Sequence, residues 1–210
     1  CVGRLAFPIF AFMIAEGCYY TSNVKKYMLR LFLFAIISEI PFNLIMGSSV
    51  FYPFHQNVLW TFLLGVLSIQ IIEKAKKKQK KWISFFVVCL VLLMDFLLGT
   101  ITMVDYNAAG ILTVLLFYFF RKKTWISFAA QLVGLYYLNV VMLGNLYYPV
   151  TILGHHFEIA QQSFALLALI PIWLYHGEQG YHSKWFKYFC YAFYPVHLLI
   201  LVVIWQWCIR

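Results

Sequence analysis

The sequence has few charged residues and very few acidic ones. Only 11% of its 210 residues are charged, with 7 Asp or Glu against 16 Lys or Arg. A soluble domain carries roughly 25% charged residues. By contrast, 64% of the residues are hydrophobic and the mean hydropathy is +0.82. A water-soluble core cannot absorb that much apolar surface, so the composition indicates an integral membrane protein.

The sequence also lacks the cysteine and histidine patterns of a metal or redox centre. Its cysteines, which form no CxxC pair, are Cys1, Cys18, Cys89, Cys190 and Cys208. The adjacent His155 and His156 have no third ligand at helical spacing, so solvated loop histidines are favoured over a metal site. No metal is therefore predicted.

Basic residues are absent from every second connection between the apolar segments. They concentrate in four stretches: Lys25, Lys26 and Arg30; Lys74 to Lys81; Arg121, Lys122 and Lys123; and Lys184 with Lys187. The connections near 46–56, 99–106 and 144–158 contain none. This alternation follows the positive-inside rule and predicts that the four basic stretches face the cytoplasm. It also explains the excess of basic charge without a nucleic-acid partner, and the run at 74–81 adds attraction for anionic lipids.

The apolar segments predict an all-α protein, a polytopic transmembrane helical bundle that forms a single domain over residues 1–210. A bilayer core needs about 20 apolar residues per helix. Eight spans are expected, at roughly 4–21, 27–46, 57–73, 82–99, 105–120, 124–143, 159–176 and 185–207. Both ends then lie outside. We expect that one helix is missing before Cys1, since no initiator Met is present; a lipidated Cys1 is the alternative.

Four ionisable residues fall at membrane depth: Arg4, Glu16, Glu39 and His197. Burying such a charge costs at least roughly 2.5 kcal/mol on insertion scales, so each should face a partner or a wet cavity. Arg4 and Glu39 are expected at similar depth in the outer half, where a structural ion pair between them is one interpretation. A functional site is the other.

Polar residues also open three of the expected spans on the outer side. His55, Gln56 and Asn57 precede the third, Asp105, Tyr106 and Asn107 the fifth, and Glu158, Gln161 and Gln162 the seventh. Each set is explained by helix capping. Together, the three helix N-termini would offer a seat for an anionic or oxyanion-forming substrate.

Several motifs in order along the chain resemble the TraX family of conjugal-transfer membrane proteins. They are GRLAFPIFAFMIAEG at 3–17, KYMLRLFLFAIISEIPFNL at 26–44, QNVLWTFLLG at 56–65, DYNAAGILTVLLFY at 105–118, YHGEQG at 175–180 and KYFCYAFYPVHLLIL at 187–201. The resemblance covers nearly the whole chain. The family usually begins with a helix carrying an Asp-His pair, and no such helix precedes Cys1.

The resemblance implies a membrane acyltransferase, because the family is named for a protein that acetylates the N-terminus of F pilin. The implied co-substrate is cytoplasmic acetyl-CoA, and the implied acceptor is an amine or hydroxyl of a pilin-like protein or an envelope glycan. The implied location is the bacterial cytoplasmic (inner) membrane, with the protein crossing it several times.

Residues on motif positions become the catalytic and substrate-binding candidates, and basic residues at the inner end of the first two spans become the candidates for binding the donor. The catalytic candidates are His197, Glu39, Asp105 and Asn57; the substrate-binding candidates are Arg4, Gln56, Tyr106 and Glu16; and the candidates for binding the donor's phosphates are Lys25, Lys26 and Arg30. Acyl transfer to an amine needs a base, donors for the tetrahedral oxyanion and positive charge for the donor. His197, or the His of the missing helix, would be the base, and Asn57 with Gln56 the oxyanion donors.

Two other functions remain compatible with the sequence. Intramembrane charges and kinked helices also mark small transporters and channels. A non-catalytic membrane subunit of a conjugation or secretion apparatus is the third interpretation. Binding of acetyl-CoA would separate the first function from both.

Overall fold

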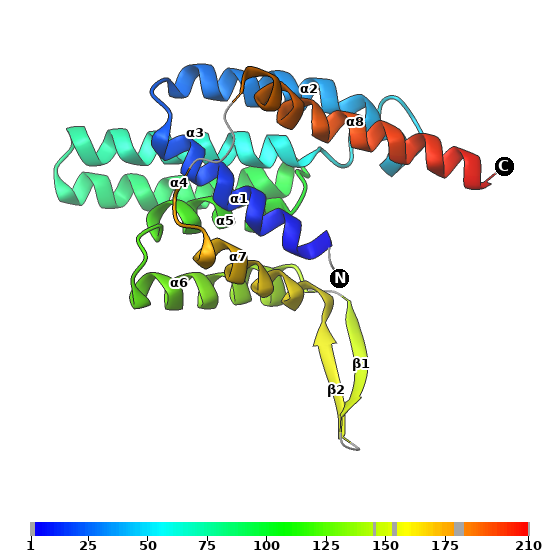
Figure 1. The fold of residues 1–210 in the computed structure, drawn as a ribbon. Coiled ribbons are helices and arrows are strands. Elements are labelled where there is room, and N and C mark those ends of the chain that lie inside the picture. Colours follow the sequence, from blue (N-terminus) through cyan, green and yellow to red (C-terminus); the bar gives the residue numbers. More distant parts are fainter. Residues whose placement is uncertain (1–2, 145, 153–154, 179–182, 210) are drawn as a thin grey trace.

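The computed structural model describes residues 3–144, 146–152, 155–178 and 183–209, and these form a helical bundle with one β-hairpin (Figure 1). The α-helices are α1 (Gly3–Tyr20), α2 (Val24–Gly47), α3 (Val58–Lys78), α4 (Lys81–Ile101), α5 (Asn107–Phe119), α6 (Trp125–Tyr136), α7 (Leu169–Leu174) and α8 (Lys184–Ile209). A π-helical turn, η1 (Tyr137–Met142), extends α6, and a 3-10 helix, η2 (Gln161–Ala168), precedes α7. The prediction of an all-α bundle is confirmed.

Six predicted spans coincide with single α-helices, including the short one expected at 105–120, which is α5. The span at 124–143 corresponds to α6 with η1, and the span at 159–176 to η2 with α7. By length and hydropathy, five segments could cross a membrane: Val24–Gly47, Val58–Lys78, Lys81–Ile101, Trp125–Met142 and Tyr188–Cys208. The α5 helix and the segment Gln161–Leu174 are apolar but shorter, and α1 is not among the five. The expected eight spans are therefore right as helical segments and approximate as membrane crossings.

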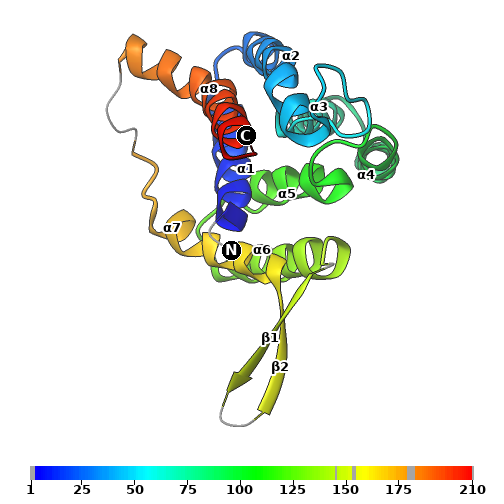
Figure 2. The same ribbon diagram turned by 90° about the vertical axis from the view of Figure 1, so that its right-hand side faces the viewer.

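Two of the segments outside this group of five, α1 and α5, lie in the middle of the bundle. The α1 helix packs against α3, α5 and η2, and α5 packs against α1, α3, α4 and α6. Figure 2, a view along the helices, shows α1 and α5 between α2 and α3 on one side and α6 and α7 on the other. A helix surrounded by protein needs no continuous lipid-facing surface, because its neighbours satisfy its polar groups. Helix α1 keeps an exposed face, with Phe10 47% and Met13 57% exposed, and it can carry both Arg4 and Glu16 because each finds a partner on a neighbouring segment.

A β-hairpin replaces the unstructured connection expected at 144–158. Strand β1 (Tyr147–Ile152) pairs antiparallel with β2 (His155–Ala160), with Tyr147 opposite Ala160. The hairpin projects away from the helices (Figure 1). Its strands are rich in aromatic and β-branched residues, which favour extended backbone, so this signal was present in the sequence. The side chains of His155 and His156 lie outside the described part of the chain, so their predicted lack of a metal stays a prediction.

Three of the four basic stretches gather at one end of the bundle. The α1–α2, α3–α4 and α5–α6 turns all lie on the left in Figure 1, and the hairpin and both chain ends lie on the right. Contacts across these turns agree: the Lys76 ammonium lies 4.2 Å from the ring centroid of Phe119. We call this the basic end and the other the opposite end. The alternation predicted from Lys and Arg positions therefore corresponds to two physical ends of the molecule.

Small residues allow the helices of the core to approach closely. Ala11 and Ala15 of α1 are at most 2% exposed. A Cβ at Gly65 would lie 2.9 Å from Val114, and one at Gly99 would lie 2.5 Å from the backbone N of Ala108. Since lipid supplies no hydrophobic force between helices, such close contact is a main source of packing energy in a membrane bundle.

The packing of α4 on α5 predicts the effect of one added methyl group. We expect Gly99→Ala to lower the stability of the bundle by about 1 to 3 kcal/mol, the usual cost of overpacking, because the Cβ would meet backbone that cannot rotate away. Thermal unfolding of the purified protein in detergent measures this. Gly3→Ala is the matched control, since nothing lies within 4 Å of its Cβ. Equal melting temperatures for the two variants would contradict the prediction.

Candidate functional site

Two connections are joined by backbone hydrogen bonds at the opposite end of the bundle. The N–H of Gln56 donates to the carbonyl of Met103 at 3.0 Å, and the N–H of Asp105 donates to the carbonyl of Gln56 at 2.9 Å. These bonds form a parallel bridge between Gln56 and Val104. They hold the N-termini of α3 and α5 side by side, as the sequence predicted for a shared site.

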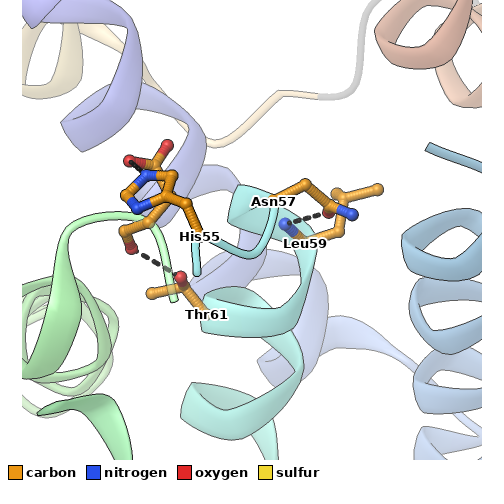
Figure 3. Close-up of polar contacts among 5 residues, drawn as sticks. His55, Asn57, Leu59 and Thr61 are labelled. Atoms are coloured by element: carbon orange, nitrogen blue, oxygen red, sulfur yellow. Dashed lines mark hydrogen bonds and ion pairs between the residues drawn. The ribbon is translucent and has the colours of Figure 1, made fainter. Parts of the chain in front are cut away.

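Asn57 is the fully buried N-cap of α3, with 0% of its surface exposed. Its Oδ1 accepts from the N–H of Leu59 at 3.0 Å, a bond that Figure 3 shows. Its Nδ2 donates to the carbonyl of Ala35 at 2.8 Å and to Oε2 of Glu39. Asn57 therefore ties the start of α3 to the middle of α2, and both of its amide hydrogens are engaged.

Glu39 lies over the N-terminus of α3, with one carboxylate oxygen hydrogen-bonded and the other without a hydrogen bond among the described residues. Its Oε2 also accepts from the indole Nε1 of Trp60 at 2.9 Å. Its Oε1 is buried and has no hydrogen-bond partner among the described residues. The positive end of a helix dipole favours a carboxylate here. A buried oxygen without a donor is costly, so this atom is suited to receive a hydrogen bond from a ligand.

His55 and Asp105 form a histidine–carboxylate pair beside this network. The His55 Nε2 lies 3.5 Å from Asp105 Oδ1, and the two side chains are 35% and 29% exposed. The ring of Phe42 stacks on the imidazole. Thr61 Oγ1 donates to the backbone carbonyl of Asp105 at 2.7 Å, as Figure 3 shows. The hydrogen bond to Asp105 raises the pKa of His55 above 6.5; burial opposes this, and the charges of Asp105 and Glu39 add to it.

Tyr106 and Arg4 complete this end of the bundle. Tyr106 takes a left-handed backbone conformation (φ 63°) before α5, and its ring stacks on Phe7 with the centroids 3.8 Å apart. Arg4 interacts with the Tyr106 hydroxyl and donates to Gln161 Oε1 at 3.5 Å. The stacking and the arginine connect the start of α1 to the start of α5 and to η2.

The structure brings six of the predicted site residues to this end: Arg4, Glu39, Gln56, Asn57, Asp105 and Tyr106. The expected ion pair between Arg4 and Glu39 is wrong, because each has other partners. Arg4 on α1 faces α5 and η2, whereas Glu39 on α2 faces α3. Although α1 and α2 are consecutive in sequence, α3 packs between α2 and α5, so their side chains are directed to different neighbours.

The other predicted site residues lie elsewhere. Glu16 is at the basic end, where its Oε1 lies 3.2 Å from Arg121 Nε. Lys25 and Lys26 are exposed, and the Arg30 guanidinium lies between the rings of Tyr27 and Tyr191. These residues are therefore separate from the cluster at the opposite end.

His197 points along its own helix, and Tyr194 reaches the cluster instead. The His197 Nδ1 lies 3.0 Å from the carbonyl of Phe193, and its ring stacks on the Phe193 ring. The Tyr194 hydroxyl lies at the backbone N–H of Val58, within the electrostatic reach of Asp105 and Glu39. The α8 helix, which packs on α2, thus contributes a tyrosine to the cluster.

Sequence reasoning missed Trp60, Thr61 and Tyr194, and it noted His55 without including it in the site. Trp60 and Thr61 lie in the first turn of α3. In the sequence alone they are indistinguishable from residues that only pack against neighbouring helices. It also missed Asp95, which is 3% exposed and accepts from Ser68 Oγ at 2.6 Å between α3 and α4. Within the described residues, no group of three or more His, Cys, Asp or Glu side chains is placed to hold a metal ion.

Comparison with known proteins gives two matches over nearly the whole chain. The model of the TraX protein family matches residues 1–205. A protein of Dichelobacter nodosus named "Probable fimbrial assembly protein FimC, serogroup H1" is 26% identical over 208 residues, which is 95% of this chain and 80% of the relative. No solved structure matches.

The buried position of Asn57 predicts a larger mutational effect than helix capping alone would give. Loss of an N-cap costs about 1 kcal/mol. Asn57→Ala also removes a donor from the buried Glu39 carboxylate, which adds about 1 to 3 kcal/mol. The matched control is Asn23→Ala: Asn23 caps α2 from an exposed position, where its side chain accepts from the N–H of Lys26 at 3.0 Å. In thermal unfolding, Asn57→Ala should therefore melt clearly below Asn23→Ala, and the reverse order would refute the role of the Glu39 bond.

Proposed function

The chain belongs to the TraX family, and from this premise we propose that it is an integral membrane acyltransferase. It transfers an acetyl group from cytoplasmic acetyl-CoA to an amine or hydroxyl of an acceptor reached from the membrane or from its outer face. The name of the Dichelobacter relative refers to fimbrial assembly. A pilin-like protein is therefore the favoured acceptor, and an envelope glycan is the alternative.

The observation that carries the proposal is the cluster at the opposite end, where a histidine–carboxylate pair lies beside a half-satisfied buried carboxylate. An oriented base and groups that receive a substrate are the parts that acyl transfer requires. In this proposal His55 is the base and Asp105 orients it. If neutral His55 donates its Nε2–H to Asp105, its Nδ1 is free to accept a proton. The His197 Nδ1, which lies close to a backbone carbonyl, is less available.

The step balances without a further reactant. The acceptor nitrogen or oxygen attacks the thioester carbon and forms a C–N or C–O bond, while His55 takes the proton from the acceptor. The C–S bond then breaks, and the CoA thiol leaves with a proton returned by His55. The hydroxyls of Tyr194 and Tyr106 are the proposed donors to the oxyanion, because both Asn57 amide hydrogens are already engaged. Asn57 instead positions Glu39, whose free Oε1 receives a hydrogen bond from the acceptor.

The transport and non-catalytic alternatives make a different prediction for donor binding. A transporter, or a membrane subunit of a pilus or conjugation apparatus, has no need of acetyl-CoA. Failure of the full-length protein in detergent to bind acetyl-CoA would remove the acyltransferase proposal and favour one of these functions.

The proposal places the protein in the bacterial inner membrane with its basic end in the cytoplasm, and accessibility labelling tests this. The native cysteines are first replaced by alanine, and single cysteines are then introduced by Lys78→Cys at the basic end and Val50→Cys at the opposite end. Both positions are exposed, and Val50 is 62% exposed. An impermeant thiol reagent added outside intact spheroplasts should label only the Val50 variant. Labelling of the Lys78 variant instead would reverse the orientation.

The assignment of His55 as base predicts an effect on rate and on its pH dependence. His55→Ala should lower acyl transfer by about 10²- to 10⁴-fold, the range for loss of a general base, and leave acetyl-CoA binding nearly unchanged. Because Asp105 raises the pKa of His55, wild-type activity should fall as the pH drops through a value above 6.5. Asp105→Asn should move this acid limb to lower pH.

His197→Ala is the control for the assignment, since it removes an imidazole that lies on the same end but outside the cluster. It should retain most of the activity. Loss in His197→Ala with full activity in His55→Ala would exchange the two roles. An equal loss of acyl-transfer activity in the two variants, with a parallel drop in their melting temperatures, would indicate a structural effect.

A further inference from the structure

A pocket of about 210 Å³ opens at the basic end of the bundle. It lies among α1, the α5–α6 connection, α6 and the end of α7. Charged side chains line it together with aromatic ones, including Glu16, Arg121, Lys123, Phe12 and Trp173. Glu16 stands 12 residues after Arg4 on α1, about 18 Å along the helix. The pocket is therefore distinct from the cluster at the opposite end.

Arg121 is held in place inside this pocket. Its Nε lies 3.2 Å from Glu16 Oε1, and the two side chains are 21% and 16% exposed. The guanidinium carbon lies 3.3 Å from the ring centroid of Tyr19, and the guanidinium also donates to the Tyr20 hydroxyl. Among the described residues, the bonds to Glu16 and Tyr20 account for two of the five guanidinium donors. An arginine with a preset side chain and donors to spare loses little entropy when it binds an oxyanion.

The wall opposite Arg121 is preformed by hydrogen bonds between distant segments. Gln131 is 2% exposed; its Nε2 donates to the carbonyl of Phe120 and its Oε1 accepts from the indole of Trp173, each at 2.8 Å. Lys123 Nζ donates to the carbonyls of Trp173 and Tyr175. These bonds join the α5–α6 connection and the middle of α6 to the end of α7, so the pocket does not need to be assembled by a ligand.

Building on the proposed acyltransferase function, we infer that this pocket binds the phosphate-bearing end of a CoA-type acyl carrier, with Arg121 as the phosphate ligand. Arg121 and Lys123 against Glu16 give these three lining side chains a net positive charge. Guanidinium groups bind phosphate through paired hydrogen bonds. Pockets for drug-sized molecules measure about 300 to 1,000 Å³. The smaller volume here suits a phosphate and its neighbouring atoms, with the rest of the carrier outside the pocket.

This assignment differs from the expectation that Lys25, Lys26 and Arg30 bind the donor's phosphates. None of the three lines the pocket. The two lysines are exposed on the first turn of α2, and Arg30 lies 5.9 Å and 5.8 Å from the ring centroids of Tyr27 and Tyr191. Exposed lysines attract anions without orienting them. Arg121, bound to the partly buried Glu16 carboxylate and stacked on the Tyr19 ring, can select one geometry.

Equilibrium binding of two acyl carriers to the full-length protein in detergent tests the inference. One probe is acetyl-CoA, and the other is acetyl-pantetheine, which has no phosphate. Arg121→Gln should weaken acetyl-CoA binding about 10- to 100-fold, as expected for loss of charge-assisted hydrogen bonds, and leave acetyl-pantetheine binding unchanged. Lys78→Gln is the matched control, since it removes one exposed positive charge from the same end. Its affinity for acetyl-CoA should stay within about twofold of wild type, because an exposed charge is screened.

Arg121→Lys is a second test variant that serves if Arg121→Gln fails to fold. It keeps the positive charge and loses the paired hydrogen-bond donors. An intermediate affinity for acetyl-CoA in a variant that melts like wild type supports the inference. Wild type that binds acetyl-CoA with no weakening in Arg121→Gln, or with the same weakening in Lys78→Gln, overturns the pocket assignment and leaves the acyltransferase proposal standing. Wild type that does not bind acetyl-CoA overturns both.

Discussion

The absence of hydrogen-bonding groups in lipid is the constraint on which the rest of this structure depends. Backbone groups at membrane depth must be satisfied within the protein, so the apolar segments become helices and polar groups collect at the helix ends. The first N–H groups of each helix still need acceptors. At α3 the need is met by Asn57, and the same side chain binds Glu39. Capping and assembly of the polar cluster are thus one interaction.

Helix α1 links the two polar ends of the protein. The α1 helix carries Arg4 near one end and Glu16 near the other, and each is bound to a residue from a distant segment, Gln161 and Arg121. If the donor's phosphates bind at the basic end and the acceptor at the opposite end, the acetyl group must lie about 18 Å from the phosphates, measured along α1. A donor with a long flexible arm meets this requirement, whereas a compact donor does not. The separation of the ends therefore favours an acyl donor with a long flexible arm.

The close packing of the core fixes the position of the helices that carry these two ends. Glycines at the α3–α5 and α4–α5 contacts bring backbones together, and the bond from Ser68 to Asp95 joins α3 to α4. Because α3 and α5 both begin in the cluster, their relative position decides whether the Gln56–Val104 bridge forms. The contact of Gly99 with Asn107 and Ala108 lies next to Asp105, so the packing of α4 on α5 supports this part of the cluster.

The sequence by itself determined the helices, their order and the end at which each charge lies. Hydropathy and the spacing of Lys and Arg are local properties, so the spans at 27–46 and 105–120 were predicted within a few residues of α2 and α5. It did not determine which polar side chains meet. Each residue turns a helix by about 100°, so partner choice depends on helix rotation and on neighbours far along the chain. Tertiary packing alone decided that Glu16 pairs with Arg121, 105 residues away, that Arg4 turns from Glu39, and that Tyr194 rather than His197 enters the cluster.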